Sequence, residues 1–247
     1  GYEWVNHSMQ PTRLSSHDFR VWIGGTPDEA QQGADPCSRP YHASVFNISA
    51  MSFGALSGNA IQALNQGAKM GGFIHDTGEG SISQYHRMHG GDLIWEVASG
   101  YFGCRNADGT FSEEKFIANA TDPQVKMIEI KLSQGAKPGH GGILPRHKVT
   151  AEISLTRGVP MGQDCISPAR HSAFATPTEL LQFIARLRRH ILALSRAKLV
   201  RTFDVSRAQA AAPRSGQVVV VRGHQRHLLR RQVKHPRHAQ VGVGVGL

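Results

Sequence analysis

The sequence predicts an α/β fold built from parallel βαβ units. Two observations lead to this prediction: short apolar segments of strand length alternate with amphipathic helices, and the segments after the strands are rich in glycine and charge. In such folds the loops that follow the strands carry the chemistry. These loops are residues 51–57, 76–83 and 133–142.

The first elements follow a long lead-in, residues 1–44, that is interrupted by prolines. Within it, residues 18–23 alternate polar and apolar side chains, which predicts a strand. A short buried strand is predicted for residues 45–50. A helix is predicted for residues 58–69, with Ser57 as its N-cap and a pair of glycines at its end.

Three further strands and one helix are predicted downstream. The strands are residues 73–75, 127–132 and 164–166, and a long insertion precedes the second of them. The last helix is predicted for residues 177–189, because Thr176 can cap it and apolar residues recur at helical spacing.

The positive charge is confined to one part of the chain. The 247 residues carry a formal net charge of +10, which alone would favour a nucleic-acid or polyanion binder. However, residues 1–186 hold 15 Lys and Arg against 17 Asp and Glu, whereas residues 187–247 hold 13 against one. The basic character therefore belongs to the last quarter, and a nucleic-acid partner is not predicted for the rest.

Cysteine spacing and hydropathy argue against several classes of protein. Cys37, Cys104 and Cys165 are widely separated, so neither a zinc site nor a disulfide framework is indicated. No apolar run approaches the roughly 18 residues of a spanning helix, and no signal peptide opens the chain. We expect a cytoplasmic protein. Because Gly1 is not a natural start, we also expect a fragment, and membrane association through an upstream segment stays open.

Two glycine-rich loops contain candidate site residues. Lys131 stands at the end of an apolar strand, where a cation is costly unless an anion pairs with it, and the glycines that follow let backbone amides approach a ligand. This loop suits a phosphate, a carboxylate or an anionic ring, and a solvated loop explains it equally well. Glu79 is either an acid/base group or an ordinary turn carboxylate, and Arg157 could be a surface charge.

A third polar motif does not indicate a metal site. His86, His89 and Asp92 have a spacing that matches no metalloprotease pattern, and adjacent glycines argue against a helix that presents them. No metal ligand is predicted.

Together, these loops resemble the FMN-binding synthase domain of glutamate synthase, in its stand-alone bacterial form. The similar segments are residues 1–8, 47–57, 77–80, 90–104, 127–145, 166–174 and 180–188. The run QGAKPG that begins at Gln134 is the most specific of them. The resemblance implies a TIM (β/α)8 barrel with FMN at the carboxyl ends of its strands, of which this chain carries about the first half.

The resemblance also implies a reaction and a cofactor site. In that family, reduced FMN reduces 2-iminoglutarate, formed from 2-oxoglutarate and ammonia, to L-glutamate. Ala50, Met51 and Ser52 match the first FMN-contacting loop. Lys131 matches a strand-end lysine near the flavin, where it could stabilise negative charge on the ring.

The substrate residues are implied in the same way. Gln134, Lys137 and Arg157 match groups that hold the carboxylates of 2-oxoglutarate, which need cations. Glu79 matches a glutamate near the ammonia entry, so Glu79 and Lys131 are the candidate catalytic residues.

Three features depart from the pattern. His140 stands where the large glutamate synthases usually have glutamate, and Ser81 replaces a glycine. No glutaminase domain precedes the segment, so we expect free ammonia or ammonia from a partner amidotransferase. No pyridine-nucleotide motif identifies the electron donor.

The resemblance stops near residue 188. The family continues with glycine-rich loops for the FMN phosphate and three cysteines for a 3Fe-4S cluster, and residues 189–247 contain no cysteine. We therefore divide the chain into a lead-in (1–44), a partial barrel (45–188) and an unstructured basic tail (189–247). The tail is interpreted as out-of-frame translation, with a genuine basic arm as the rival. We expect the chain as given to bind FMN poorly and to be inactive.

Two other functions stay open at this point. One is an FMN barrel oxidoreductase with a different keto or imino substrate. The other is a non-enzymatic remnant that binds nucleic acid through its basic tail.

Overall fold

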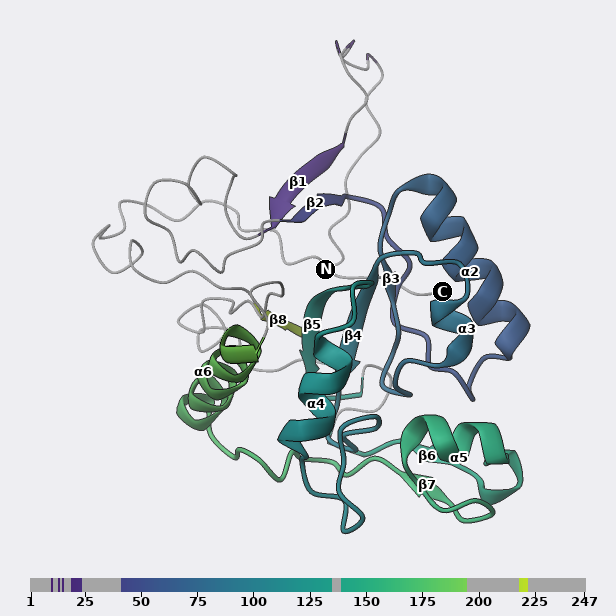
Figure 1. Cartoon of the computed structure of the whole chain (residues 1–247), viewed down its shortest axis with the longest axis vertical. Helices are drawn as coiled ribbons and strands as arrows, with labels where there is room; N and C mark the ends of the chain where they lie inside the picture. Colours follow the sequence, from purple (N-terminus) through teal and green to yellow (C-terminus); the bar gives the residue numbers. More distant parts are fainter. Residues whose placement is uncertain are drawn as a thin grey trace.

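The computed structural model describes residues 10, 13, 15, 19–23, 41–134, 139–194 and 218–221, with side chains as far as Arg189. Its centre is a sheet with the strand order β3-β4-β5-β8 (Figure 1). These strands are β3 (His75–Asp76), β4 (Leu93–Val97), β5 (Val125–Lys131) and β8 (Val218–Val221). β3, β4 and β5 are parallel, and β8 pairs antiparallel with β5.

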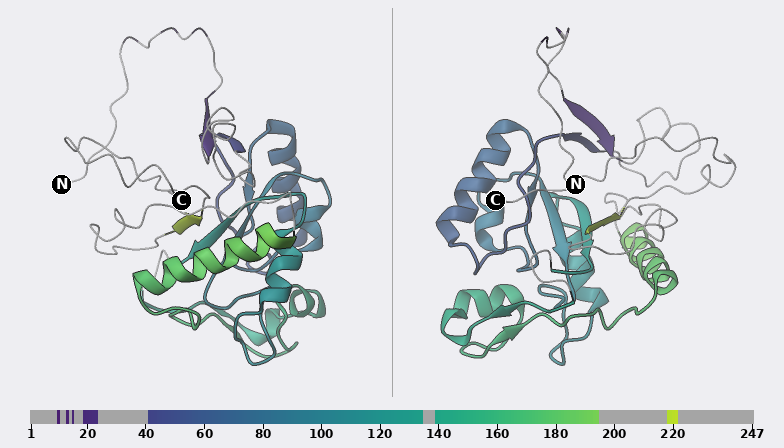
Figure 2. Two further views of the ribbon diagram at one scale, coloured as in Figure 1. Left: turned by 60° about the vertical axis from the view of Figure 1, so that its left-hand side comes forward. Right: turned by 180° about the vertical axis from the view of Figure 1, so that it is seen from behind.

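Helices connect and cover the parallel strands. α2 (Gly58–Gly71) precedes β3, α3 (Gln84–Arg87) lies between β3 and β4, and α4 (Glu113–Ala120) lies between β4 and β5. α6 (Pro177–Leu194) packs beside α4, as the two views of Figure 2 show. Parallel strands joined through helices confirm the predicted α/β class.

The helix predicted for residues 58–69 is confirmed together with its caps. The hydroxyl oxygen of Ser57 accepts a hydrogen bond from the backbone N–H of Ala60 at 3.3 Å. At the other end, Gly72 has φ 65° and donates its backbone N–H to the carbonyl of Ala68. This is the left-handed ending that favours glycine.

Alternating side chains give the sheet an apolar face and a charged face. Trp95 and Val97 from β4 and Ile128 and Ile130 from β5 are buried on the helix side. They pack against α4 and α6 through Phe116, Leu180, Phe183, Ile184 and Leu187. Burial of each such side chain contributes ~1.5–3 kcal/mol. The residues between them on the strands, among them Glu96, Glu129 and Lys131, point to the opposite face.

One βα unit was not predicted from the sequence. The segment that was interpreted as a long insertion before residue 127 contains both β4 and α4. β4 includes a charged residue, Glu96, which interrupts its apolar run. α4 is only 8 residues long and buries only Phe116 and Ala120, too few positions to display a helical period.

Two predicted strands need correction. Residues 45–50 are not a strand, because only Ile48 forms an isolated bridge, with His75. The strand lies earlier, as β2 (Tyr41–Ser44), and pairs antiparallel with β1 (Arg20–Ile23).

The second correction concerns residues 164–166. β7 (Cys165–Ile166) is not a fourth parallel strand but pairs antiparallel with β6 (Ile143–Leu144) in a separate two-stranded sheet. The segment between β6 and β7 contains a turn of 3-10 helix, η1 (Arg146–Lys148), and α5 (Ala151–Arg157). These elements lie below the central sheet in Figure 1. β6 and β7 are each two residues long, and they pair with each other.

The described residues do not form a closed barrel, and their central sheet has four strands. The predicted helix at residues 177–189 continues to Leu194. In the part of the chain that the structure describes, none of the helices has the length and apolar character needed to cross a membrane. The tail, residues 189–247, was predicted to be unstructured, and this is wrong for its described parts, because α6 continues to Leu194 and residues 218–221 form β8 beside β5. The rest of the tail lies outside the described residues.

Candidate active site

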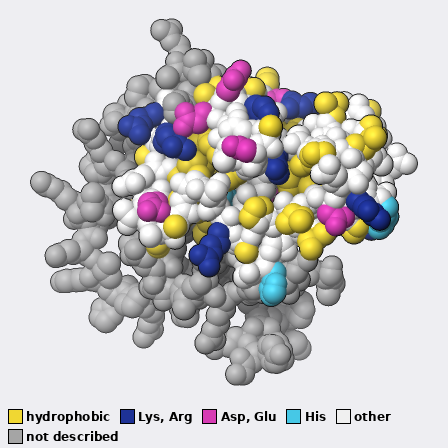
Figure 3. Space-filling model, turned by 90° about the horizontal axis from the view of Figure 1, so that it is seen from below, with side chains coloured by type: hydrophobic (Ala, Val, Ile, Leu, Met, Phe, Trp, Pro, Cys, Tyr) yellow, Lys and Arg dark blue, Asp and Glu magenta, His cyan; other side chains and the backbone are white. Residues whose placement is uncertain are grey.

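The predicted site loops converge at the carboxyl ends of the parallel strands. Of the predicted loops, residues 77–83 follow β3, and the described residues of 133–142 follow β5. Residues 98–104, which follow β4, were not predicted as a site loop. Parallel strands end at one edge, so residues that are far apart in sequence meet there. Figure 3 views the molecule from below, the end at which α5, β6 and β7 lie in Figure 1. Acidic, basic and apolar side chains are interspersed on that face.

Glu79, Lys131 and Gln134 are brought together. The side-chain amide of Gln134 donates to the two carboxylate oxygens of Glu79 at 3.1 and 3.0 Å. The ammonium of Lys131 lies 3.8 Å from Glu79 Oε2 and 3.2 Å from Glu96 Oε1. Three side chains that the sequence suggested on separate grounds therefore form one cluster, and Glu96 is a fourth member that the sequence analysis did not identify.

The first predicted loop packs against the loop that carries Glu79. The hydroxyl oxygen of Ser52 accepts a hydrogen bond from the backbone N–H of Gly80 at 3.2 Å. Gly78 has φ +63°, and a Cβ atom there would lie 2.6 Å from the backbone nitrogen of Ser52. Only glycine fits such an approach. Ala50 is exposed and Met51 is half-buried beside this contact.

Arg157 contacts both the first loop and the glutamate loop. Its side chain is buried, with Nη2 donating to the carbonyl oxygen of Phe53 at 2.8 Å and the guanidinium 5.1 Å from the ring centre of Phe102. A Cβ atom on Gly80 would lie 3.2 Å from Nη2. Arg157 thus ties α5 to the first loop, and its buried Nε has no hydrogen-bond partner among the described residues. Lys137 lies outside the described residues.

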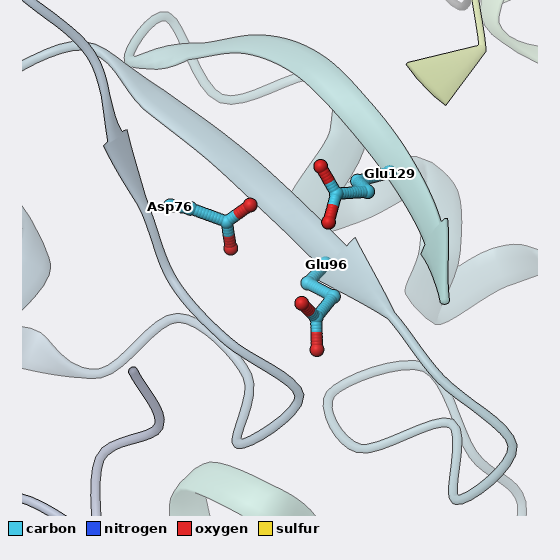
Figure 4. Close-up of side chains that lie close together, drawn as sticks. All are labelled: Asp76, Glu96 and Glu129. Atoms are coloured by element: carbon cyan, nitrogen blue, oxygen red, sulfur yellow. The ribbon is translucent and has the colours of Figure 1, made fainter. Parts of the chain in front are cut away.

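Three buried carboxylates occupy the charged face of the sheet. Asp76, Glu96 and Glu129 come from β3, β4 and β5, and each offers an oxygen within 4.8 Å of the others. Figure 4 shows their carboxylates turned toward a common space. Glu96 and Glu129 are direct neighbours in the register of β4 and β5. Such oxygens could also surround a cation, but here the ammonium of Lys131 already pairs with Glu96.

Burial and mutual repulsion favour the neutral form of these three groups. Burial, with the charge of Glu96 adding to it, raises the pKa of Glu129 from 4.5 to about 8. Burial and the charges of Glu129 and Glu96 raise the pKa of Asp76 well above its usual range. Burial also raises the pKa of Glu96, although the charge of Lys131 opposes that rise. Asp76 and Glu129 therefore retain protons near neutral pH, and Glu96 is the member of the cluster that pairs with Lys131.

The space beside Lys131 is small in the described structure. A hollow of about 10 Å³ is lined by residues after β4 and β5, among them Lys131, Gln134 and His140. That is close to the least volume that holds one water molecule. A larger hollow, of about 490 Å³, lies elsewhere, between α3, α4 and α5, and none of the predicted site residues lines it.

The structure also shows the surroundings of Ser81, of the polar motif and of two cysteines. Ser81, which replaces a family glycine, has φ 72°, the left-handed conformation that favours glycine. His86 is buried, with its Nδ1 hydrogen-bonded to Ser83, while Asp92 accepts from Tyr41. Cys104 and Cys165 are buried free thiols.

Comparison with known proteins gives the family. The sequence profile described as "Conserved region in glutamate synthase" matches residues 32–226. The glutamate synthase large subunit-like protein YerD of Bacillus subtilis strain 168 is 39% identical over 165 residues, which cover 66% of this chain and 31% of that protein. The archaeal-type glutamate synthase (NADPH) of Dehalococcoides mccartyi is 32% identical over 226 residues, covering 87% of this chain and 42% of that protein.

A third relative agrees with these two. The archaeal glutamate synthase (NADPH) of Methanocaldococcus jannaschii is 41% identical over 141 residues, covering 57% of this chain and 25% of that protein. The chain spans less than half the length of each of these three relatives. The profile match over most of the chain shows that it belongs to the glutamate synthase family, a family of oxidoreductases.

Proposed function

We propose that this chain provides part of an FMN-dependent oxidoreductase that reduces 2-iminoglutarate, formed from 2-oxoglutarate and ammonia, to L-glutamate. The observation that carries the proposal is the meeting of Glu79, Lys131 and Gln134 at the ends of two parallel strands. Family membership supplies the reaction class. We also propose that the described α/β unit is the first part of a TIM barrel, with residues 45–188 as its contribution.

The donor chemistry of the site suits the ring end of a flavin. FMN, when bound, supplies the hydride. Lys131 provides a cation at a strand end, where it would offset negative charge on a reduced ring. Ala50, Met51 and Ser52 would line the same ligand from the neighbouring loop, which is held against Gly78. In the family the loops for the FMN phosphate follow the part that residues 45–188 match, and we do not expect residues 189–247 to supply them.

Gln134, Lys137 and Arg157 would bind the two carboxylates of the substrate. The amide of Gln134 is half-buried and already donates to a carboxylate, that of Glu79. A substrate carboxylate would take over this donor and release Glu79, which could then accept a proton from ammonium or return one to the product nitrogen. The names of two relatives specify NADPH, which makes it the first electron donor to assay.

The small hollow beside Lys131 leads to an expectation for the cofactor. A space of about 10 Å³ holds neither a flavin ring nor 2-oxoglutarate unless the loops around it move apart, and the family's loops for the FMN phosphate are not expected in this chain. We expect the 247-residue chain alone to bind FMN weakly, and purified protein to show little flavin absorbance after gel filtration with added FMN. One equivalent of retained flavin would contradict this expectation.

Substrate binding tests the proposed function directly. Calorimetric titration of the full chain with 2-oxoglutarate should show binding that Gln134→Ala weakens. Lys137→Met, which removes a cation assigned to a substrate carboxylate, should weaken it further, by ~10-fold or more, which corresponds to the loss of a charge-assisted hydrogen bond. Lys126→Met is the matched control, because it removes a lysine that pairs with Asp92 away from the site. Equal binding of a 2-oxo monocarboxylate would favour the alternative of a different substrate.

The status of residues 189–247 needs its own measurement. We propose that this segment is out-of-frame translation, although the family profile matches the chain as far as residue 226. The DNA sequence across codons 185–250, read in all three frames, tests it. A family-like sequence in another frame supports the proposal, whereas its absence from every frame contradicts it.

A further inference from the structure

His171 lies in the segment between β7 and α6 and contacts the backbone of Lys131. Its imidazole is 7% exposed. One ring nitrogen, Nε2, is 2.7 Å from the backbone carbonyl oxygen of Lys131, and the other, Nδ1, is 3.2 Å from the hydroxyl oxygen of Tyr101. The ring of Phe174 stacks on the imidazole with 4.5 Å between ring centres. The side chain of His171 therefore links the turn after β4, which contains Tyr101, to the last residue of β5, Lys131.

The donors and acceptors of this network fix the state of the histidine. A carbonyl oxygen only accepts, so Nε2 must carry the proton that it donates to Lys131. Burial lowers the pKa of His171 and so favours the neutral ring, in which Nδ1 is an acceptor and the hydroxyl of Tyr101 donates to it. The oxygen of Tyr101 in turn accepts from the backbone N–H of Ala173 at 3.1 Å. A neutral imidazole satisfies every contact.

Tyr101 has a costly backbone conformation. Its φ is 49°, in the left-handed region that residues with a Cβ rarely adopt. It is 1% exposed and sits in the turn that directly follows β4. Strained residues of this kind persist where the surroundings hold them, and they cluster at functional sites. The hydrogen bonds to His171 and Ala173 are part of what holds Tyr101.

We propose that His171, supported by Tyr101, is a positioning residue for Lys131. The hydrogen bond to the Lys131 carbonyl fixes the last peptide of β5, and with it the direction in which the lysine side chain leaves the strand. That direction places the ammonium between Glu96 and Glu79. The inference rests on the proposed function and deepens it, because it concerns the lysine assigned to the flavin.

The test measures the placement of Lys131 without substrate or cofactor. The full chain is reacted with a lysine-methylating reagent, and mass spectrometry gives the rate at each lysine. His171→Phe keeps the aromatic packing and removes both nitrogens. We expect the Lys131 rate to rise about fivefold, the change in population that one ordinary hydrogen bond controls. His171→Gln, which retains an N–H donor, should restore most of the protection.

Lys126 is the internal control, because it lies on the same strand and is paired with Asp92 at 3.4 Å. Its rate should not change in any variant. Faster labelling of both lysines would show that His171 only stabilises the fold, and an unchanged Lys131 rate would overturn the proposal as well. Should His171→Phe not fold, Tyr101→Phe decides, with a smaller rise at Lys131 expected. Since no ligand is present, a failure here is separate from a failure to bind 2-oxoglutarate.

Discussion

Glu129 should make the stability of this protein fall as the pH rises. Its pKa is raised from 4.5 to about 8 in the folded chain, chiefly by burial. Between these two values the folded state holds a proton that the unfolded state has released. The contribution to stability is therefore fully present below pH 4.5 and is lost as the pH rises through 8. The slope is ~1.4 kcal/mol per pH unit, and the whole change amounts to at most ~5 kcal/mol.

Glu129→Gln removes this titration with almost no change in shape. The free energy of unfolding of the variant should exceed that of the parent by an amount that grows from pH 4.5 to pH 8. The measurement is urea denaturation at half-unit pH steps, followed by circular dichroism. Loss of Glu129 also removes a charge that raises the pKa of Asp76, which acts in the same direction.

An exposed glutamate provides the control for that experiment. Glu114 lies in the first turn of α4 and is exposed, so Glu114→Gln should shift the unfolding free energy by a similar amount at every pH. A difference between Glu129→Gln and the parent that does not vary with pH would refute the reasoning. So would a difference that shrinks as the pH rises.

Variants at two further positions test the backbone strain at Ser81 and the burial of the His75 imidazole. Ser81→Gly should be more stable than Ser81→Ala by ~1 kcal/mol in urea denaturation, because both lack the hydroxyl and only glycine adopts φ 72° freely; equal stabilities would contradict the assigned conformation. His75 is fully buried, neither ring nitrogen has a hydrogen-bond partner among the described residues, and burial lowers its pKa from 6.5 to about 4. At pH 7 the unpaired nitrogens of His75 cost stability, so His75→Leu should raise the unfolding free energy by ~1–3 kcal/mol. Below pH 6.5 the unfolded histidine takes up a proton that the folded one refuses until about pH 4, so the stability of the parent falls as the pH falls. The advantage of His75→Leu should therefore be ~2 kcal/mol larger at pH 5. A gain that is the same at both pH values would exclude a neutral buried histidine.

The sequence predicted those elements whose local signals agree with their tertiary environment. α2 has a capping serine, a regular apolar stripe and terminal glycines, and it forms as predicted. β4 was missed because one of its two faces carries a glutamate. Residues 45–50 are apolar enough for a strand, yet only Ile48 finds a partner, since the neighbouring chain there is the short strand β3. Whether a short strand forms depends on its pairing partner, and no local sequence pattern specifies that partner.

The candidate site was predicted in its loops and missed on its strands. Glycines and charges after strands indicated Glu79 and Lys131, the family resemblance indicated Gln134, and these side chains do meet. Glu96 was missed because β4 was not predicted, and Glu129 was missed because its strand was interpreted as apolar throughout. The signal was present in β5, where Glu129 and Lys131 are two residues apart and so share a face. A charged pair at that spacing within an otherwise apolar strand indicates a polar face.

The buried acids explain how Lys131 can both be paired and be available to an anion. Within the described residues, the ion pairs of Lys131 are with Glu79 and Glu96. If both carboxylates were fully ionised, an incoming dicarboxylate would have to displace two negative charges from one ammonium. Burial raises the pKa of Glu96, so its ionised form is costly to keep, and protonation of Glu96 frees the lysine. Under the proposed function, the raised pKa of Glu96 would therefore lower the cost of bringing an anion to Lys131.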